Sequence, residues 1–176
     1  MMNNDDQLVE YQKMCNILCT SENTAERNQA ETLLFGFISN LQNLPKIEMI
    51  LSETNDLFTV FATFEYLAKT FAAIRTEDEE DKKNSPTHTN QRELLLKVVE
   101  LILNFTNQKP VFLSKSLTLN STAHLLATLT DKLWNLLDEP LILIQKLQLN
   151  GNILKNPEAE LFRMKVYEYI INSIAS

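Results

Sequence analysis

The sequence predicts an all-α fold built from antiparallel helix pairs, and three observations lead to that prediction. Only 2 glycines and 5 prolines occur in 176 residues, which leaves little material for β-turns. Hydrophobic residues make up 44% of the chain and charged residues 22%, a composition typical of globular proteins. Apolar residues recur at steps of three and four, the spacing of a helix with one buried face. We therefore expect one domain over 1–176, either an α-solenoid of HEAT-like pairs or a compact helical bundle.

The first forty residues predict the first helix pair. The apolar stripe of its first helix consists of Leu8, Tyr11, Cys15 and Leu18. Asn4 or Asp5 is the expected N-cap of this helix, and residues 20–23 connect it to a second helix that Thr24 would cap. The stripe of the second helix consists of Ala30, Leu33, Leu34, Phe37, Ile38 and Leu41. The two stripes are expected to face each other.

A second pair is predicted over 44–74. The Asn-Leu-Pro step at 43–45 precedes a short helix with Ile47, Ile50 and Leu51 on its apolar side. Polar residues at 52–55 end this helix, and Asp56 begins a longer one. The apolar positions of the longer helix are Phe58, Phe61, Phe64, Leu67, Ala68, Phe71 and Ile74. Because they cover a wide arc, we expect this helix to pack on both sides.

An acidic surface loop is predicted at 76–89. Glu77 to Asp81 are five carboxylates in a row, followed by Lys82, Lys83 and a Ser-Pro step. A charge run of this kind resists burial and usually stays in solvent. An acidic segment with a binding role is the alternative interpretation.

The third pair is predicted to begin at Asn90, and its first helix is predicted to end before Pro110. Its first helix carries Leu94, Leu95, Val98, Val99, Ile102 and Phe105. Its second helix is predicted from Val111 to Trp134. The residues expected to face inward are Leu117, Leu125, Leu126, Leu129 and Leu133.

The last forty residues are less regular. The segment 135–156 fits either helix or strand, because an apolar run at 141–144 is followed by alternation, and we interpret it as a connection with one short helix. A final helix begins at Pro157 with Asn156 as its N-cap. Its stripe consists of Phe162, Val166, Tyr169, Ile170 and Ile174.

Composition argues against several classes of function. The net charge of -7 disfavours a nucleic-acid binder, which needs clustered Lys and Arg. The first residues lack the features of a signal peptide, and no apolar stretch approaches the ~18 residues of a membrane span. We therefore expect no membrane insertion and a location in the cytosol or nucleus. Cys15 and Cys19 share one helix face without further zinc ligands, which predicts reduced thiols and no metal site.

The sequence offers no catalytic constellation, so we expect no enzyme activity and no cofactor. The histidines are His88, in the predicted polar loop, and His124, on a predicted helix. Gly36 and Gly151 are isolated, which excludes glycine-rich nucleotide-binding motifs. A helical-bundle metalloenzyme is the alternative, but neither histidine follows a glutamate by three residues.

The stretch from Thr24 to Leu33 resembles the signature on the second helix of the karyopherin-β N-terminal domain. The residues that carry the match are Arg27, Ala30, Glu31 and Leu33. Tyr66-Leu-Ala-Lys69 is similar to a Leu-x-Lys segment on the inner helix of the second repeat. The segments at 110–115 and 129–134 resemble the third inner helix of the exportin seven (Ran-binding protein sixteen) branch, and 161–163 resembles the start of the fourth outer helix. The segments 77–83 and 136–149 have no counterpart in that family.

The resemblance implies an exportin-like nuclear transport receptor that shuttles between nucleus and cytoplasm. Its implied partners are Ran-GTP on the inner helices, protein cargo on the longer solenoid, and nucleoporin phenylalanine-glycine repeats on the outer face. The residues expected on the Ran-binding surface are Glu31, Glu65, Lys69, Thr70 and Ala73. A different HEAT or armadillo scaffold or adaptor, without Ran binding, is the alternative.

Overall fold

The computed structural model describes residues 4–73 and 86–137, together with Met164 and Glu168. Within these ranges all regular structure is helical, which confirms the all-α prediction. The chain divides into two compact units, Met1–Thr70 and Phe71–Ser176. None of the described helices is both long enough and apolar enough to cross a membrane.

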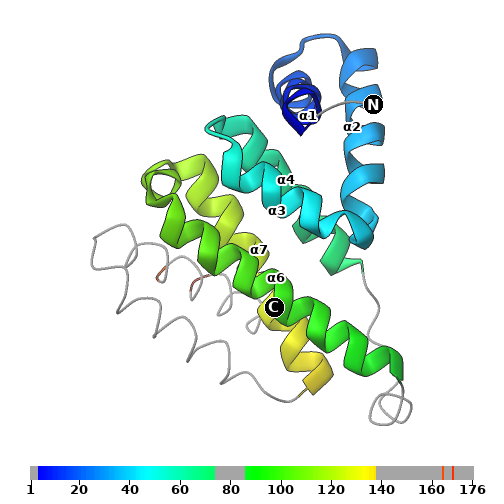
Figure 1. Ribbon diagram of the computed structural model, residues 1–176, viewed down its shortest axis with the longest axis vertical. Helices are drawn as coiled ribbons and strands as arrows, with labels where there is room; N and C mark the ends of the chain where they lie inside the picture. Colours follow the sequence, from blue (N-terminus) through cyan, green and yellow to red (C-terminus); the bar gives the residue numbers. More distant parts are fainter. Residues whose placement is uncertain (1–3, 74–85, 138–163, 165–167, 169–176) are drawn as a thin grey trace. The chain divides into compact units, whose positions relative to one another are not determined.

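The first unit begins with α1 (Asn4–Thr20) and α2 (Thr24–Ser39), which pack together as predicted. Residues 21–23 connect the two helices. In Figure 1 α1 is seen nearly end-on and α2 nearly lengthwise, so the two helices cross steeply and do not form the antiparallel pair that was predicted. On α1 the buried side chains are Tyr11 and Cys15, and the ring of Tyr11 meets the edge of Phe37 at a centroid distance of 5.6 Å.

Two details of α2 differ from the prediction. Its N-cap is Asn23, whose side-chain oxygen accepts hydrogen bonds from the backbone N–H groups of Ala25 (3.0 Å) and Glu26 (3.3 Å). Thr24 is instead the first helical residue, because the extended backbone at Asn23 already aims a good capping side chain at the free N–H groups. Leu33 is 55% exposed, whereas Leu34 is fully buried. The buried line advances by steps of four through Ala30, Leu34 and Ile38, and Leu33 lies off that line.

The rest of the first unit follows the prediction closely. A short 3-10 turn, η1 (Leu41–Asn43), leads into α3 (Leu44–Glu53). The inward residues of α3 are Leu44, Ile47, Ile50 and Leu51, all buried. The helix α4 (Leu57–Ala72) follows, and Asp56 caps it by accepting a hydrogen bond from the N–H of Thr59 at 3.1 Å.

The helix α4 is buried around most of its circumference, as its wide apolar arc predicted. Its largest fully buried side chains are Phe64, Leu67 and Phe71, while Phe58 and Phe61 are half-buried. Buried threonines accompany them, and a buried hydroxyl in a helix is commonly satisfied by the carbonyl four residues earlier. Thr63 and Thr70 both make this bond. Ile74 lies outside the described residues.

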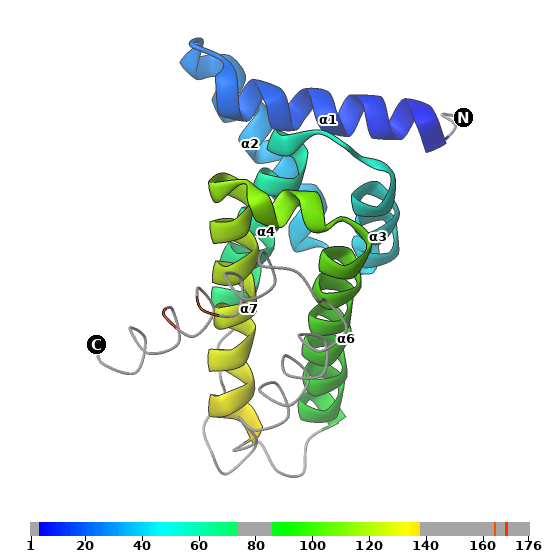
Figure 2. The same cartoon turned by 90° about the vertical axis from the view of Figure 1, so that its left-hand side faces the viewer.

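The second unit contains α6 (Pro86–Gln108), η2 (Pro110–Ser114) and α7 (Ser116–Leu137). Figure 2 shows α6 and α7 side by side and antiparallel, as predicted for the third pair. The helix α6 begins four residues before the predicted Asn90, because proline is well suited to a first helical turn. Residues 86–89 of the predicted loop are therefore helical, His88 among them. Residues 76–85 lie outside the described part.

The start of the second helix in this pair was predicted wrongly. Val111 is in η2, and α7 begins only at Ser116, because Lys115 adopts an extended backbone between them. Leu117, predicted to point inward, is 37% exposed in the first turn of α7. Further along, Leu125, Leu126 and Leu129 are buried as predicted. The side chain of Leu133, the connection after Leu137 and the final helix lie outside the described residues, except for Met164 and Glu168, which are helical and exposed.

Candidate functional site

Glu31 and Lys69, predicted on separate helices, both interact with Tyr66. The Glu31 carboxylate acts electrostatically on the Tyr66 hydroxyl and raises its pKa. The Nζ atom of Lys69 lies 4.7 Å from the centroid of the Tyr66 ring, within cation-π range. The ring of Phe35 lies 6.0 Å from the same centroid. We refer to Glu31, Phe35, Tyr66 and Lys69 as the Tyr66 cluster.

Helical spacing explains why these four side chains meet. Glu31 and Phe35 are four residues apart on α2, and Tyr66 and Lys69 are three apart on α4, so each pair shares one side of its helix. Tyr66 is buried, Phe35 is 40% exposed, and Glu31 and Lys69 are exposed. The cluster therefore presents one anion, one cation and part of an aromatic ring to solvent, above a buried phenol.

The phenol of Tyr66 is held in its neutral form. Burial, and after it the Glu31 carboxylate, whose negative charge opposes formation of a phenolate, together raise the pKa of Tyr66 to about 12. At neutral pH Tyr66 is thus an uncharged phenol beside the Glu31 carboxylate.

Glu31→Gln is expected to lower the pKa of Tyr66, because the variant removes the negative charge that opposes ionisation. The ionised fraction of Tyr66 at about pH 11 is measured from its Cζ chemical shift in labelled protein, and a lower pKa gives a larger fraction at that pH. Glu48→Gln, on an exposed carboxylate of α3, is the matched control and is expected to leave the titration unchanged. An unaltered Tyr66 titration in Glu31→Gln would exclude the contact.

The other predicted site residues differ in accessibility. Ala73 is exposed just after the end of α4, and Glu65 is half-buried. Thr70, predicted to be exposed, is buried, and its hydroxyl donates to the backbone carbonyl of Tyr66 at 2.8 Å. Thr70 lies four residues after the buried Tyr66, so it turns inward with it. Thr70 is thus unsuited to direct contact with a partner.

Four residues of α2 carry the resemblance to the karyopherin-β N-terminal domain. One of them is in the core and three are on the surface. Ala30 is buried, whereas Arg27, Glu31 and Leu33 are exposed. The guanidinium of Arg27 donates to the Thr24 hydroxyl at 3.4 Å, a contact within the first turn of the same helix.

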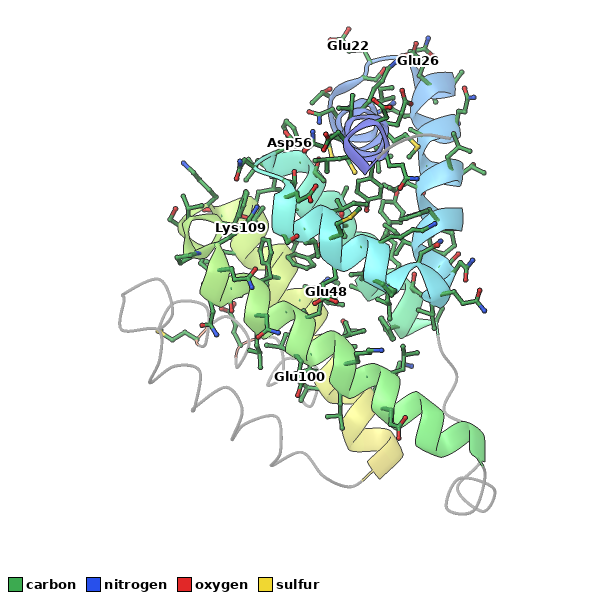
Figure 3. All side chains as sticks on the ribbon, in the orientation of Figure 1. Glu22, Glu26, Glu48, Asp56, Glu100 and Lys109 are labelled. Carbon is green, nitrogen blue, oxygen red and sulfur yellow. The ribbon has the colours of Figure 1, made fainter. Side chains whose placement is uncertain are left out.

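A polar network between α1 and the start of α4 was not predicted from the sequence. Asp56, labelled in Figure 3, accepts a hydrogen bond from the Asn16 side chain at 2.7 Å. The Thr54 hydroxyl donates to the Gln12 side chain at 2.6 Å. Deeper in the unit, the Tyr11 and Thr63 hydroxyls lie 2.7 Å apart. These bonds join side chains forty or more positions apart, and we interpret the network as structural because each partner satisfies another.

The two cysteines are free thiols with little tendency to ionise. Cys15 is buried and Cys19 half-buried, and burial raises the pKa of each thiol, with the Asp56 carboxylate adding to both. A raised thiol pKa disfavours nucleophilic chemistry, which requires the thiolate. Among the side chains that the structure describes, no group of three His, Cys, Asp or Glu residues could hold a metal ion.

His124 is exposed on α7. The Tyr66 cluster brings together two of the site residues predicted from the sequence, Glu31 and Lys69, and we take it as the candidate site. Comparisons of the chain with protein-family models, curated proteins and solved structures find no match.

Proposed function

We propose that this chain is the N-terminal portion of an exportin-like nuclear transport receptor, an α-solenoid whose inner helices bind Ran-GTP. The observation that carries the proposal is the convergence of Glu31 and Lys69 on Tyr66. The resemblance named Glu31 and Lys69 as Ran-binding residues, and they come from the second helices of two successive predicted pairs. A surface shared by such helices is what a partner on the inner face of a solenoid requires.

The chemistry of the cluster suits a polar protein surface. Lys69 offers a cation to a partner carboxylate, Glu31 offers an anion to a partner lysine or arginine, and Phe35 adds exposed aromatic area. Because Lys69 lies over the Tyr66 ring, fewer of its rotamers are lost on binding than for a free surface lysine. The site is thus partly preorganised before a partner arrives.

Transport would follow from differential affinity. Ran-GTP and export cargo would each favour the same solenoid curvature, so each would strengthen the binding of the other. Hydrolysis of GTP on Ran would remove this mutual gain and release the cargo. Nucleoporin phenylalanine-glycine repeats on the outer face would allow shuttling between nucleus and cytoplasm. This chain would supply binding surfaces and no chemical step.

Lys69→Glu in the full chain is expected to weaken Ran-GTP binding by about tenfold, since it replaces an attraction with a repulsion at the centre of the contact. The affinity is measured by titration calorimetry with Ran that carries a non-hydrolysable GTP analogue. Lys13→Glu, a charge reversal at an exposed lysine of α1, is the matched control.

Circular dichroism of both variants tests that the helices remain folded. Equal losses in Lys69→Glu and Lys13→Glu would show that net charge, and not the Tyr66 cluster, governs binding. Unchanged affinity in Lys69→Glu would remove the cluster from the Ran contact. A chain that binds neither nucleotide form of Ran would favour the scaffold or adaptor alternative.

A further inference from the structure

The turn between α6 and α7 is a hydrogen-bonded corner with apolar and basic side chains on its outer surface. Its backbone is fixed by hydrogen bonds from the N–H of Lys109 to the carbonyl of Phe105 (2.8 Å) and from the N–H of Phe112 to the carbonyl of Lys109 (3.2 Å). The Thr118 hydroxyl donates to the carbonyl of Phe112 and so ties the first turn of α7 to η2. Figure 3 labels Lys109 at this end of the second unit.

Packing inside the corner determines which side chains face outward. Phe112 and Leu113 are buried, and the ring of Phe112 stacks on Phe105 at a centroid distance of 5.7 Å. In a 3-10 helix residues three apart lie on the same side, so Val111 and Ser114 both point away from that core. Val111 is 61% exposed.

The outward surface continues into the first turn of α7. Lys115 and Leu117 are both exposed, and Leu117 retains 37% of its accessible surface. We refer to Val111, Ser114, Lys115 and Leu117 as the η2 corner. Two apolar side chains thus flank an exposed lysine on a fixed backbone.

The stretch of sequence that contains the η2 corner carries a charge opposite in sign to that of the chain as a whole. The formal net charge of the chain is -7. No Asp or Glu occurs between Glu100 and Asp131, a stretch that lies wholly within the described residues and contains Lys109, Lys115 and His124. An anionic ligand would therefore meet less repulsion here than an average surface of this protein presents.

We propose that the η2 corner is a docking site for an acidic segment of a partner protein that carries one or two apolar anchor residues. Acidic side chains of the segment would pair with Lys115, and the anchors would cover Val111 and Leu117. The fixed backbone lowers the ordering cost of binding on this side of the interface. The proposal goes beyond Ran binding and involves none of the residues of the Tyr66 cluster.

Other anionic or apolar occupants fit the η2 corner less well. Stable attachment to an anionic membrane takes a cluster of roughly four to eight basic residues, and the sequence provides two lysines between Glu100 and Asp131. A nucleic acid likewise requires several phosphate contacts. A second copy of this chain would bring another net charge of -7 and the repulsion that goes with it.

The test is a titration of the full ¹⁵N-labelled chain, followed by NMR, with a synthetic peptide of alternating Asp or Glu and Leu or Phe. Amide signals of residues 109–119 are expected to shift with this peptide, and the effect is expected to weaken as salt is added. The comparison peptide has lysine at every acidic position and is expected to leave these signals in place. Equal shifts with both peptides, or shifts confined to other regions, would overturn the proposal.

Substitutions of Lys115 test how much its charge contributes to peptide binding at the η2 corner. Lys115→Glu is expected to weaken peptide binding about fivefold, while Lys97→Glu, at an exposed lysine of α6, leaves it unchanged. Lys115→Gln provides the same comparison, with a smaller loss, if the charge reversal impairs folding. If the amide signals of residues 109–119 shift when only the protein concentration is raised, the η2 corner binds a second copy of the chain. If the chain binds only to phosphatidylserine vesicles, the corner binds a lipid surface. Either result would contradict the proposal.

Discussion

Leu34→Ala is expected to lower the free energy of unfolding by about 2 to 5 kcal/mol, whereas Leu33→Ala is expected to change it by less than about 0.5 kcal/mol. The two leucines are neighbours on α2, so the substitutions alter helix propensity and hydrophobicity in the same way. Leu34 has no exposed surface and Leu33 is 55% exposed. The difference in stability therefore reports burial alone.

Urea unfolding followed by circular dichroism at 222 nm gives both values, and unchanged denaturant slopes would show that the comparison is valid. Similar losses in the two variants would mean that Leu33 is also covered in solution. A larger loss in Leu33→Ala would contradict the orientation of α2 in the first unit.

Asp56→Ala is expected to cost about 2 to 3 kcal/mol of stability, because it removes a helix cap and the acceptor of the buried Thr59 hydroxyl in one step. The Asp56 carboxylate accepts hydrogen bonds from the N–H and the hydroxyl of Thr59 and from the side chain of Asn16. After substitution the first turn of α4 lacks its acceptor, and Asn16 loses the bond that links α1 to α4.

Asp56→Asn is the matched comparison. Asparagine caps a helix about as well as aspartate, so this variant retains the bond to the Thr59 N–H and is expected to lose less stability than Asp56→Ala. Thermal unfolding of both variants measures the difference. If Asp56→Ala were as stable as the unaltered chain, the network between α1 and α4 would carry no net free energy.

Helix positions were predictable from the sequence because a buried helix face requires apolar residues at a spacing of three or four. Leu34 and Ile38 on α2, or Val98 and Ile102 on α6, repeat at the spacing of a helical face. Helix ends were predicted less well, since they depend on which of several adequate side chains captures the free backbone groups. Asn23 caps α2 in place of Thr24, and η2 separates Val111 from the start of α7.

The candidate site was predictable only in part. Glu31 and Lys69 were named from the resemblance, but nothing in the sequence indicates that Tyr66 lies between them or that Phe35 joins it. Such contacts depend on how α2 and α4 pack. Two residues that are far apart in the sequence leave no repeating pattern that would reveal their contact. The bond between Asn16 and Asp56 escaped prediction for the same reason.

Binding at the Tyr66 cluster and binding at the η2 corner can be tested separately. Lys69 belongs to the first unit, and Lys115 belongs to the second. Loss of Ran binding in Lys69→Glu with intact peptide binding at residues 109–119 would support two independent surfaces. Loss of both in one variant would indicate a general effect on folding.

The most direct measurement of the proposed function is a titration of the full, unaltered chain with Ran in its two nucleotide states. The proposal predicts binding to Ran that carries a non-hydrolysable GTP analogue, at least about tenfold tighter than to Ran-GDP, because a transport receptor must distinguish the two forms. Equal affinity for the two forms, or no binding to either, would contradict it.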